Sequence, residues 1–209
     1  MDSFDELYLC AKEKIISADN IAVVTHINPD GDCMGSAAAL KELIKNLGKD
    51  ADIYNENGCP AYLEFAQDCK AVSTCTDSDS KYDLVICVDC GSIDRAGKVS
   101  WVLESCKFMI NIDHHATNTM FADINIVDPS ASATGLLIYD FFVACSIEIT
   151  KRTAELLYTA VATDTGNFSY ANTDKRTHIV AGELVDKGID VAELSRRLFR
   201  ATTYNRLKL

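Results

Sequence analysis

Side chains that bind metal ions gather in four short segments of this sequence. The segments contain His26, Asp30, Asp32, Asp89, Asp113, His114, His115 and Asp164. Three of the four histidines of the chain lie in them, and only His178 lies outside. Carboxylate and imidazole donors together suit Mn²⁺, Mg²⁺ and similar divalent ions. Two such ions about 3.5–4 Å apart need a carboxylate that bridges them. The segments therefore predict a two-metal site if the fold brings them together.

Each of these residues also has a structural interpretation, which the sequence leaves open. His26 suits a surface or capping position. Asp30 and Asp32 suit a Pro-Asp-Gly-Asp turn in which Gly31 has a positive φ, and Asp32 also suits the N-cap of a following helix. Turn, loop or helix-end positions would equally suit the remaining candidates: Asp89, residues 113–115 and Asp164. However, four neighbouring carboxylates without a metal would repel one another and raise their pKa values, which is hard to explain in a purely structural cluster.

The elements that position these residues follow from the apolar pattern. Five short apolar runs predict strands at residues 21–26, 51–54, 84–88, 108–112 and 123–127. Helical spacing predicts helices over 4–18, 33–47, 132–145, 151–163, 174–187 and 191–200. We therefore predict an α/β fold, with a mainly parallel five-stranded sheet flanked by helices and a more helical C-terminal part. Because ligands of such sheets bind beyond the carboxyl ends of the strands, the candidate residues would converge there.

The composition restricts the classes of function. The chain has 209 residues and a net charge of −11, because 31 acidic residues outnumber 20 basic ones. This balance argues against sequence-independent binding to duplex DNA, which needs a basic surface. No apolar run approaches the roughly 20 residues that span a bilayer, and the acidic N-terminus lacks the features of a signal peptide. The nine cysteines are an odd number, which favours a reducing compartment. We therefore expect a cytoplasmic protein with no membrane partner.

Two other motifs do not favour a different function. Cys87 and Cys90 form a CxxC pair, but a single pair is weak evidence for a zinc or redox site. The segment 91–99 resembles a phosphate-binding loop, but it has one residue too many. Val99 also stands where Ser or Thr would bind Mg²⁺. The sequence therefore predicts neither a nucleoside-triphosphate site nor a dinucleotide cofactor.

Taken in order, the four segments resemble the motifs of the DHH phosphoesterase family. The matching residues are 24–36 (VTHINPDGDCMGS), 88–91 (VDCG), 111–115 (NIDHH) and 162–168 (ATDTGNF). Four motifs in the right order are far more specific than any one of them. Residues 128–135 (DPSASATG) and 172–178 (NTDKRTH) are similar to segments of one branch of the family. The substrates of that branch are short oligoribonucleotides and 3′-phosphoadenosine 5′-phosphate (pAp). The resemblance implies a manganese-dependent phosphoesterase that hydrolyses one or both.

The resemblance also implies a role for each candidate residue. One metal ion would be bound by His26, Asp30 and Asp89, and the second by Asp32, Asp89, His114 and Asp164. The ions would be two Mn²⁺, with Mg²⁺ or Co²⁺ as alternatives, and they would activate a water for in-line attack on phosphorus. As catalytic residues, His115 would hydrogen-bond the phosphate or the leaving oxygen, and Asp113 would orient a neighbouring histidine. The simpler alternative for Asp113 is a strand cap.

Further residues are candidates for substrate contacts: Arg95, Arg176, Gly31 and Ser132. A guanidinium binds phosphate through two hydrogen bonds, although a surface ion pair explains either arginine equally well. Gly31 would let the backbone approach the phosphate, and Ser132 lies in the segment that follows the third motif. The rings of Phe168 and Tyr170 suit either base stacking or core packing.

Other activities stay open. The alternatives are cleavage of cyclic dinucleotides, exonuclease action on single-stranded DNA, and non-catalytic binding of metal and nucleotide. We expect residues 1–190 to form a DHH phosphoesterase domain, and residues 191–209 to begin a linker helix toward a C-terminal substrate-binding domain. The Gly-rich, His-containing motif that this second domain carries in the family is missing, so we expect a fragment of a longer protein. Its partner would be a short RNA or a small nucleotide, and a dimer is one alternative for its oligomeric state.

Overall fold

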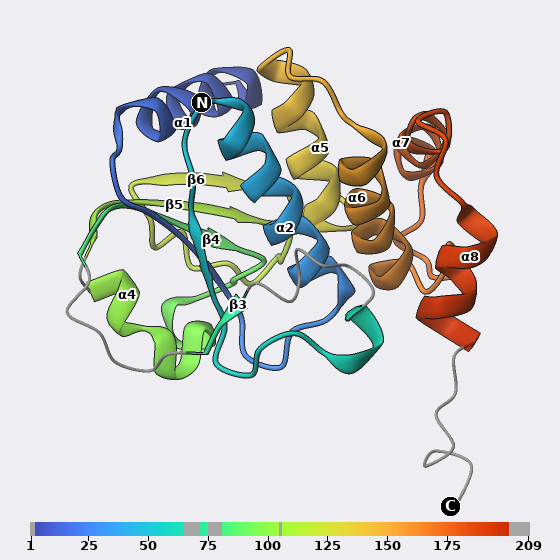
Figure 1. Cartoon of the computed structure of the whole chain (residues 1–209), viewed down its shortest axis with the longest axis horizontal. Coiled ribbons are helices and arrows are strands. Elements are labelled where there is room, and N and C mark those ends of the chain that lie inside the picture. Colours follow the sequence, from blue (N-terminus) through green and yellow to red (C-terminus); the bar gives the residue numbers. More distant parts are fainter. Residues whose placement is uncertain (1–2, 65–71, 75–80, 105, 201–209) are drawn as a thin grey trace, which may run out of the picture.

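The computed structural model describes residues 3–64, 72–74, 81–104 and 106–200. Within these residues one sheet contains six parallel strands, in the order β3-β2-β1-β4-β5-β6 (Figure 1). They are β1 (Ile21–Thr25), β2 (Asp52–Tyr54), β3 (Val72–Ser73), β4 (Tyr82–Val88), β5 (Cys106–Asp113) and β6 (Ile124–Val127). The α/β class, the parallel sheet and the five predicted strands are confirmed. β3 adds a sixth strand beyond β2, which the apolar pattern does not predict because two residues are too few to show a period.

The strand order reverses between β1 and β4. The chain proceeds from β1 outward to β2 and β3, returns to β4 beside β1, and then proceeds outward to β5 and β6. In open parallel sheets, ligands bind at such a reversal, outside the carboxyl ends of the strands. β1 and β4 end directly before His26 and Asp89. The topology therefore places two candidate metal ligands at the reversal.

Both faces of the sheet are buried. Along β4, Ile86 and Val88 belong to the larger core and Cys87 to a smaller core on the opposite face, as the twofold period of a strand requires. The larger core contains side chains of α1 (Phe4–Ser17), α2 (Gly31–Asn46), α5 (Thr134–Ala144) and α6 (Lys151–Asp164). The smaller core contains side chains of η2 (Ile93–Val99) and α4 (Trp101–Glu104). Burial on both faces explains why the strands are continuous apolar runs.

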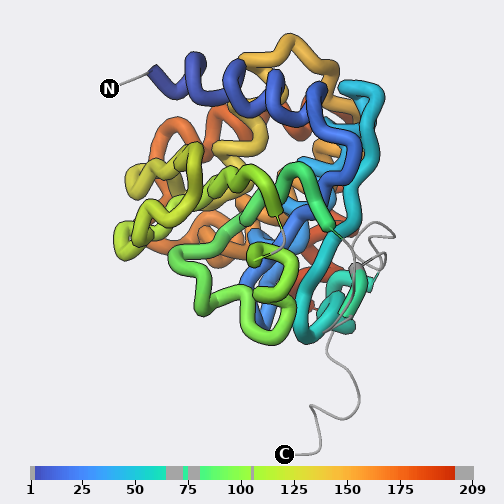
Figure 2. Tube along the Cα trace, turned by 90° about the vertical axis from the view of Figure 1, so that its left-hand side faces the viewer, coloured from blue at the N-terminus to red at the C-terminus, as the bar shows by residue number. Residues whose placement is uncertain are grey.

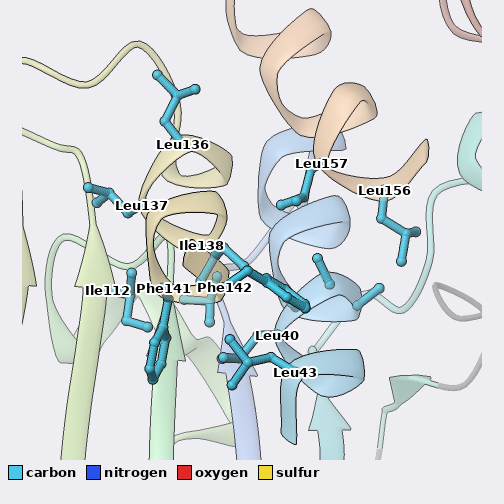
Figure 3. Close-up of a cluster of buried hydrophobic side chains, with 14 of the residues drawn as sticks. Leu40, Leu43, Ile112, Leu136, Leu137, Ile138, Phe141, Phe142, Leu156 and Leu157 are labelled. Carbon is cyan, nitrogen blue, oxygen red and sulfur yellow. The ribbon is translucent and has the colours of Figure 1, made fainter. Parts of the chain in front are cut away.

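Three helices, α2, α5 and α6, pack together in the larger core. Figure 3 shows Phe142 of α5 pointing toward α2, where Leu40 and Leu43 lie, and Leu157 of α6 pointing toward the same helix. All four side chains are completely buried. Burying one such side chain contributes about 1.5–3 kcal/mol relative to its exposed state. This packing fixes the ends of α2, α5 and α6 relative to the sheet.

The C-terminal part is mainly helical, as predicted. After α6 come α7 (Lys175–Val185), α8 (Val191–Ser195) and η3 (Arg196–Arg200), and a short η1 (Ala61–Leu63) follows β2. The helix predicted over 191–200 begins as an α-helix and continues with π-helical pairing. α1 lies across one end of the molecule (Figure 2), where Tyr8 stacks on Phe141 of α5 with ring centroids 5.2 Å apart. None of the helices described here is long and apolar enough to cross a bilayer.

Glycines let α2 approach α6 closely. A Cβ atom at Gly35 would lie 2.6 Å from the carbonyl oxygen of Leu156, and a Cβ atom at Gly31 would overlap the side chain of Thr163. Gly31 therefore serves helix packing. The alternative of a turn with a positive φ at Gly31 is wrong, because this residue begins α2 and Asp30 is the N-cap. Backbone packing thus holds the N-terminus of α2 beside the C-terminal end of α6.

Substituting Gly35 tests this packing. We expect Gly35→Ala to lower the free energy of unfolding by about 1–3 kcal/mol, because the new methyl group would displace the α6 backbone. Gly182→Ala in α7 is the matched control, since a Cβ atom there meets nothing within 4 Å. The control should leave the stability unchanged or raise it by up to about 1 kcal/mol. Equal stability of both variants in chemical denaturation would show that the contact between α2 and α6 is not tight.

Candidate metal centre

The predicted ligands converge at the carboxyl edge of the sheet. β1, β4 and β5 are neighbours, and the residues that end or directly follow them include His26, Asp89 and Asp113. Two helix ends meet the same region: α2 begins after its N-cap Asp30, and α6 ends at Asp164. The fold therefore joins four segments that are distant in the sequence.

Asp89 lies at the centre of this group. Its φ of 60° is left-handed, which aspartate tolerates better than most residues, and its backbone N–H donates to the carbonyl of Ile112. One carboxylate oxygen, Oδ2, lies 3.3 Å from Nε2 of His26. The other, Oδ1, accepts a hydrogen bond from the Thr134 hydroxyl at 2.8 Å and lies 3.8 Å from Nε2 of His114. The two oxygens face different histidines, as a bridging carboxylate requires.

The start of α5 holds the buried carboxylate of Asp32. Its Oδ2 accepts a hydrogen bond from the backbone N–H of Thr134 at 2.7 Å, and its Oδ1 accepts one from the N–H of Gly135 at 2.9 Å. The Ser36 hydroxyl also donates to Oδ1, at 3.0 Å. A helix N-terminus favours a negative charge. Thr134 thus contacts two candidate ligands, yet it is missing from the predicted site residues; its place in segment 128–135 is the signal that points to it.

Backbone carbonyls orient the two histidines. Nδ1 of His114 lies 3.1 Å from the carbonyl oxygen of Ala131, and Nδ1 of His26 lies 2.7 Å from that of Ile27. A ring that donates from Nδ1 keeps Nε2 available as a metal ligand. Nε2 of His114 lies 3.7 to 3.8 Å from carboxylate oxygens of Asp32, Asp89 and Asp164. Donors about 2.1 Å from one ion lie roughly 3–4 Å apart, so these separations suit ligands of a shared ion.

Three sets of donors among the described residues could hold a metal ion. In each set the ligand atoms lie within 4.8 Å of one another: His26, Cys33 and Asp89; Asp32, His114 and Asp164; and Asp89, His114 and His115. Asp30, expected beside His26, belongs to none of them; its exposed side chain caps α2 by accepting the N–H of Cys33 at 3.0 Å. Sequence reasoning missed Cys33, because a cysteine in a helix with an apolar stripe is typical of a core residue.

Burial and repulsion raise the pKa values of Asp32 and Asp164, but not that of Asp89. Burial and the charges of Asp89 and Asp164 raise the pKa of Asp32 well above its ordinary value. Burial and the charge of Asp89 also raise the pKa of Asp164, although the charge of His114 opposes this. Burial acts the same way on Asp89, but its hydrogen bond with His26 and the charges of both histidines lower its pKa. The prediction that repulsion raises the pKa is therefore wrong for Asp89.

Comparison with known proteins identifies the family. Residues 20–161 match the DHH family, N-terminal domain. This chain belongs to the DHH family. The bifunctional oligoribonuclease and PAP phosphatase NrnA of Thermus thermophilus is 37% identical over 188 residues, and the probable NrnA of Streptococcus mutans is 32% identical over 189 residues. These matches cover 90% and 88% of this chain but only 56% and 58% of those relatives. An exopolyphosphatase-related protein of Bacteroides fragilis has a TM-score of 0.88 and 27% identity, over 97% of this chain and 62% of that one.

The DHH motif, residues 113–115, contains the candidate metal ligand His114 and a second histidine, His115, which contacts Asp113. Asp113 is completely buried, and its Oδ1 lies 2.6 Å from Nδ1 of His115. Its Oδ2 accepts a hydrogen bond from Nδ2 of Asn118 at 2.6 Å, a contact that sequence reasoning missed. The hydrogen bond with Asp113, opposed by partial burial, raises the pKa of His115 to about 9. The side chain of Asp113 is thus positioned to orient His115, whose own side chain is 44% exposed.

The two candidate phosphate clamps of this DHH domain lie in different surroundings. Arg95 is exposed, and its Nη2 lies 3.3 Å from Nδ1 of His26, beside the metal ligands. Arg176 forms ion pairs with Asp128, at 3.2 Å, and with Asp140. The ion-pair alternative therefore describes Arg176, whereas Arg95 remains a candidate for substrate contact.

Two other predicted contacts serve packing within the domain. The Ser132 hydroxyl is buried and hydrogen-bonds the Thr177 hydroxyl at 2.8 Å. Phe168 packs against the larger core and stacks on His178, while Tyr170 is exposed. Core packing thus accounts for Phe168, and the contact with Thr177 accounts for Ser132.

Thr134 provides a test of how the carboxylates are held. We expect Thr134→Val to weaken Mn²⁺ binding about 10- to 100-fold, because Asp89 loses the hydrogen bond that orients Oδ1. Thr134→Ser retains the hydroxyl and should bind Mn²⁺ almost as the wild type does. Isothermal titration calorimetry measures both affinities. Equal affinities of the valine variant and the wild type would show that the hydroxyl does not position Asp89.

The raised pKa values of Asp32 and Asp164 predict that metal binding is coupled to proton release. A raised pKa means that the metal-free carboxyl group holds its proton to higher pH, and the ion must displace that proton to bind. We therefore expect Mn²⁺ affinity to be weaker at about pH 6 than at about pH 8. Calorimetry in two buffers of different ionisation enthalpy counts the released protons, and His178→Ala should leave this count unchanged. Identical heats in the two buffers would contradict the coupling.

Proposed function

We propose that this DHH domain is the metal-dependent catalytic domain of a phosphoesterase that hydrolyses short oligoribonucleotides and pAp. The proposal is supported above all by Asp89, whose two carboxylate oxygens face His26 on one side and His114 on the other. One carboxylate between two imidazoles suits a pair of metal ions. The relatives named as oligoribonuclease and PAP phosphatase support the class of substrate.

The donor chemistry fits two Mn²⁺ ions. Carboxylate oxygens and imidazole nitrogens occur together in the cluster, and ions of borderline hardness accept both. His26 and Asp89 would hold one ion, and Asp89 would share the other with Asp32, His114 and Asp164. When bound, such ions neutralise charge on the phosphate oxygens and lower the pKa of an attacking water. They would also offset the repulsion that raises the pKa values of Asp32 and Asp164.

Two side chains beside the cluster would act on the phosphate. With a pKa of about 9, His115 carries a proton at neutral pH. Asp113 binds its Nδ1, so Nε2–H is the group that would donate to the phosphate or to the leaving oxygen. Arg95 adds an exposed positive charge next to His26. Local cations are needed here because the chain has a net charge of −11, which repels an anionic substrate.

We also propose that residues 1–190 are the catalytic unit and that the segment from Val191 leads toward a region that orients the substrate. The two curated relatives support this, because the matched part is only 56% and 58% of their length. Orientation of the substrate contributes several kcal/mol to catalysis. The domain described here would then supply the metal ligands, and the further region would supply part of the substrate contacts.

Substitution of the bridging residue tests the proposed reaction. Asp89→Asn keeps the size of the side chain and removes the charge that both ion positions share. We expect it to lower kcat for dinucleotide RNA and pAp at least about 100-fold at saturating Mn²⁺, which corresponds to roughly 2.7 kcal/mol of barrier. His178→Ala, the matched control outside the cluster, should retain most of the activity.

The outcomes separate the alternatives. If Asp89→Asn kept more than about a tenth of the wild-type rate, the bridging geometry would be wrong. Faster hydrolysis of a cyclic dinucleotide or of single-stranded DNA by the wild type would assign a different substrate. Mn²⁺ binding without hydrolysis of any of these substrates would favour a non-catalytic domain.

A further inference from the structure

A groove runs along α5 and α7, on a part of the surface that the proposed reaction does not use. Its first hollow, of about 810 Å³, lies between α1, α5 and α7, and its second, of about 380 Å³, lies at the C-terminal ends of α5 and α7. The two hollows share Tyr139, Val143 and Glu183, so they form one continuous depression. None of the candidate metal ligands, all of which the structure describes, lines either hollow. Two helices of 11 residues each make the groove about 16 Å long.

Large apolar side chains are exposed along this groove. Phe4 and Leu9 of α1 are 43% and 46% exposed, and Val143 of α5 and Ile179 of α7 are 57% and 51% exposed. Single exposed apolar residues are common, but several around one depression indicate a binding surface. Because these side chains are so open to water, they suit a protein partner better than a small ligand, which a pocket usually encloses.

Acidic groups surround these apolar side chains. The first hollow is lined by four carboxylates: Asp5, Asp128, Asp140 and Glu183. Among its described lining residues only Arg176 is basic, and its ion pairs with Asp128 and Asp140 leave an excess of negative charge. The Tyr139 hydroxyl donates to Glu183, which holds this carboxylate where the two hollows meet.

The helix ends and one hydroxyl group add to this character. α5 ends at Ala144 and α7 at Val185, beside the second hollow, and a helix C-terminus carries a partial negative charge. Tyr8 lines the first hollow and is 1% exposed, yet its hydroxyl has no hydrogen-bond partner in the described part of the chain. Because buried hydroxyls normally have partners, this group is available to a polar side chain of a docked protein.

We propose that this groove binds a basic amphipathic helix of a partner protein. The apolar face of such a helix would cover the exposed side chains of α1, α5 and α7, and its Lys and Arg residues would pair with the carboxylates. The negative charge repels nucleic acid and anionic lipid. A second copy that met this face with its own groove would bring the same acidic residues together. The charge of the groove therefore selects a basic partner, and this inference does not depend on the metal centre.

A model peptide tests the groove directly. The probe is a fluorescent helical peptide of about 14 residues, roughly 21 Å long, with leucine on one face and lysine on the other. A matched peptide carries glutamate in place of lysine. We expect the lysine peptide to bind the wild-type protein one to one, with an affinity that falls as salt rises. The glutamate peptide should bind at least about tenfold more weakly. Fluorescence anisotropy without added metal measures both affinities.

Variants locate the binding on the protein. Val143→Lys and Ile179→Lys each place a positive charge in the groove, and we expect each to weaken binding of the lysine peptide at least about tenfold. Ile16→Lys in α1 is the matched control, because Ile16 is 47% exposed and lines neither hollow. The control makes the same change of charge and should alter the affinity less than about twofold. Thermal melting shows that each variant is folded, and either groove variant suffices if the other does not fold.

Three results would overturn the proposal. Equal weakening in the groove variants and in Ile16→Lys would show only a general attraction between a basic peptide and an acidic protein. Equal binding of the two peptides, or binding of neither, would remove the charge selection on which the proposal depends. A wild-type dimer in sedimentation velocity that Val143→Lys dissociates would assign the groove to a second copy. None of these measurements follows turnover, so the proposed phosphoesterase is tested separately.

Discussion

The carboxylates of Asp32, Asp89 and Asp164 each lie within 3.8 Å of one imidazole nitrogen, that of His114. Burying three like charges around one point is unfavourable, because the interior does not screen their repulsion as water does. The raised pKa values of Asp32 and Asp164 express this cost. The surrounding structure offsets part of it through the N-terminus of α5, and the remaining excess of negative charge is what divalent ions would neutralise.

This constraint explains why the helices pack as they do. Thr134 and Gly135 can donate to Asp32 only if α5 begins directly beside the first turn of α2. Gly135 also lets α5 approach α6, since a Cβ atom there would lie 2.6 Å from the Cβ atom of Ala160. The start of α5 therefore both packs against α6 and donates to the buried charge of Asp32.

Much of the architecture follows from the sequence by itself. Short β-branched runs bounded by polar residues predict the five main strands, because a strand buried on both faces has no room for polar side chains. The rule that ligands bind where the strand order reverses then places His26 and Asp89 at the edge between β1 and β4. The motifs predict Asp32, His114 and Asp164 as partners, and the structure brings these three together.

Only the tertiary structure decided which side chains are available at that edge. Arg176 pairs with Asp128 and Asp140, which lie 48 and 36 residues away. The hydroxyl that holds Asp89 comes from Thr134, 45 residues later, and the thiol of Cys33 lies within 4.8 Å of ligand atoms of His26 and Asp89. Asp89 has a lowered pKa because His26 faces it. Residue types and local spacing determine which chemistry the chain can perform, whereas burial, charge pairing and contact across helices depend on distances that exist only after folding.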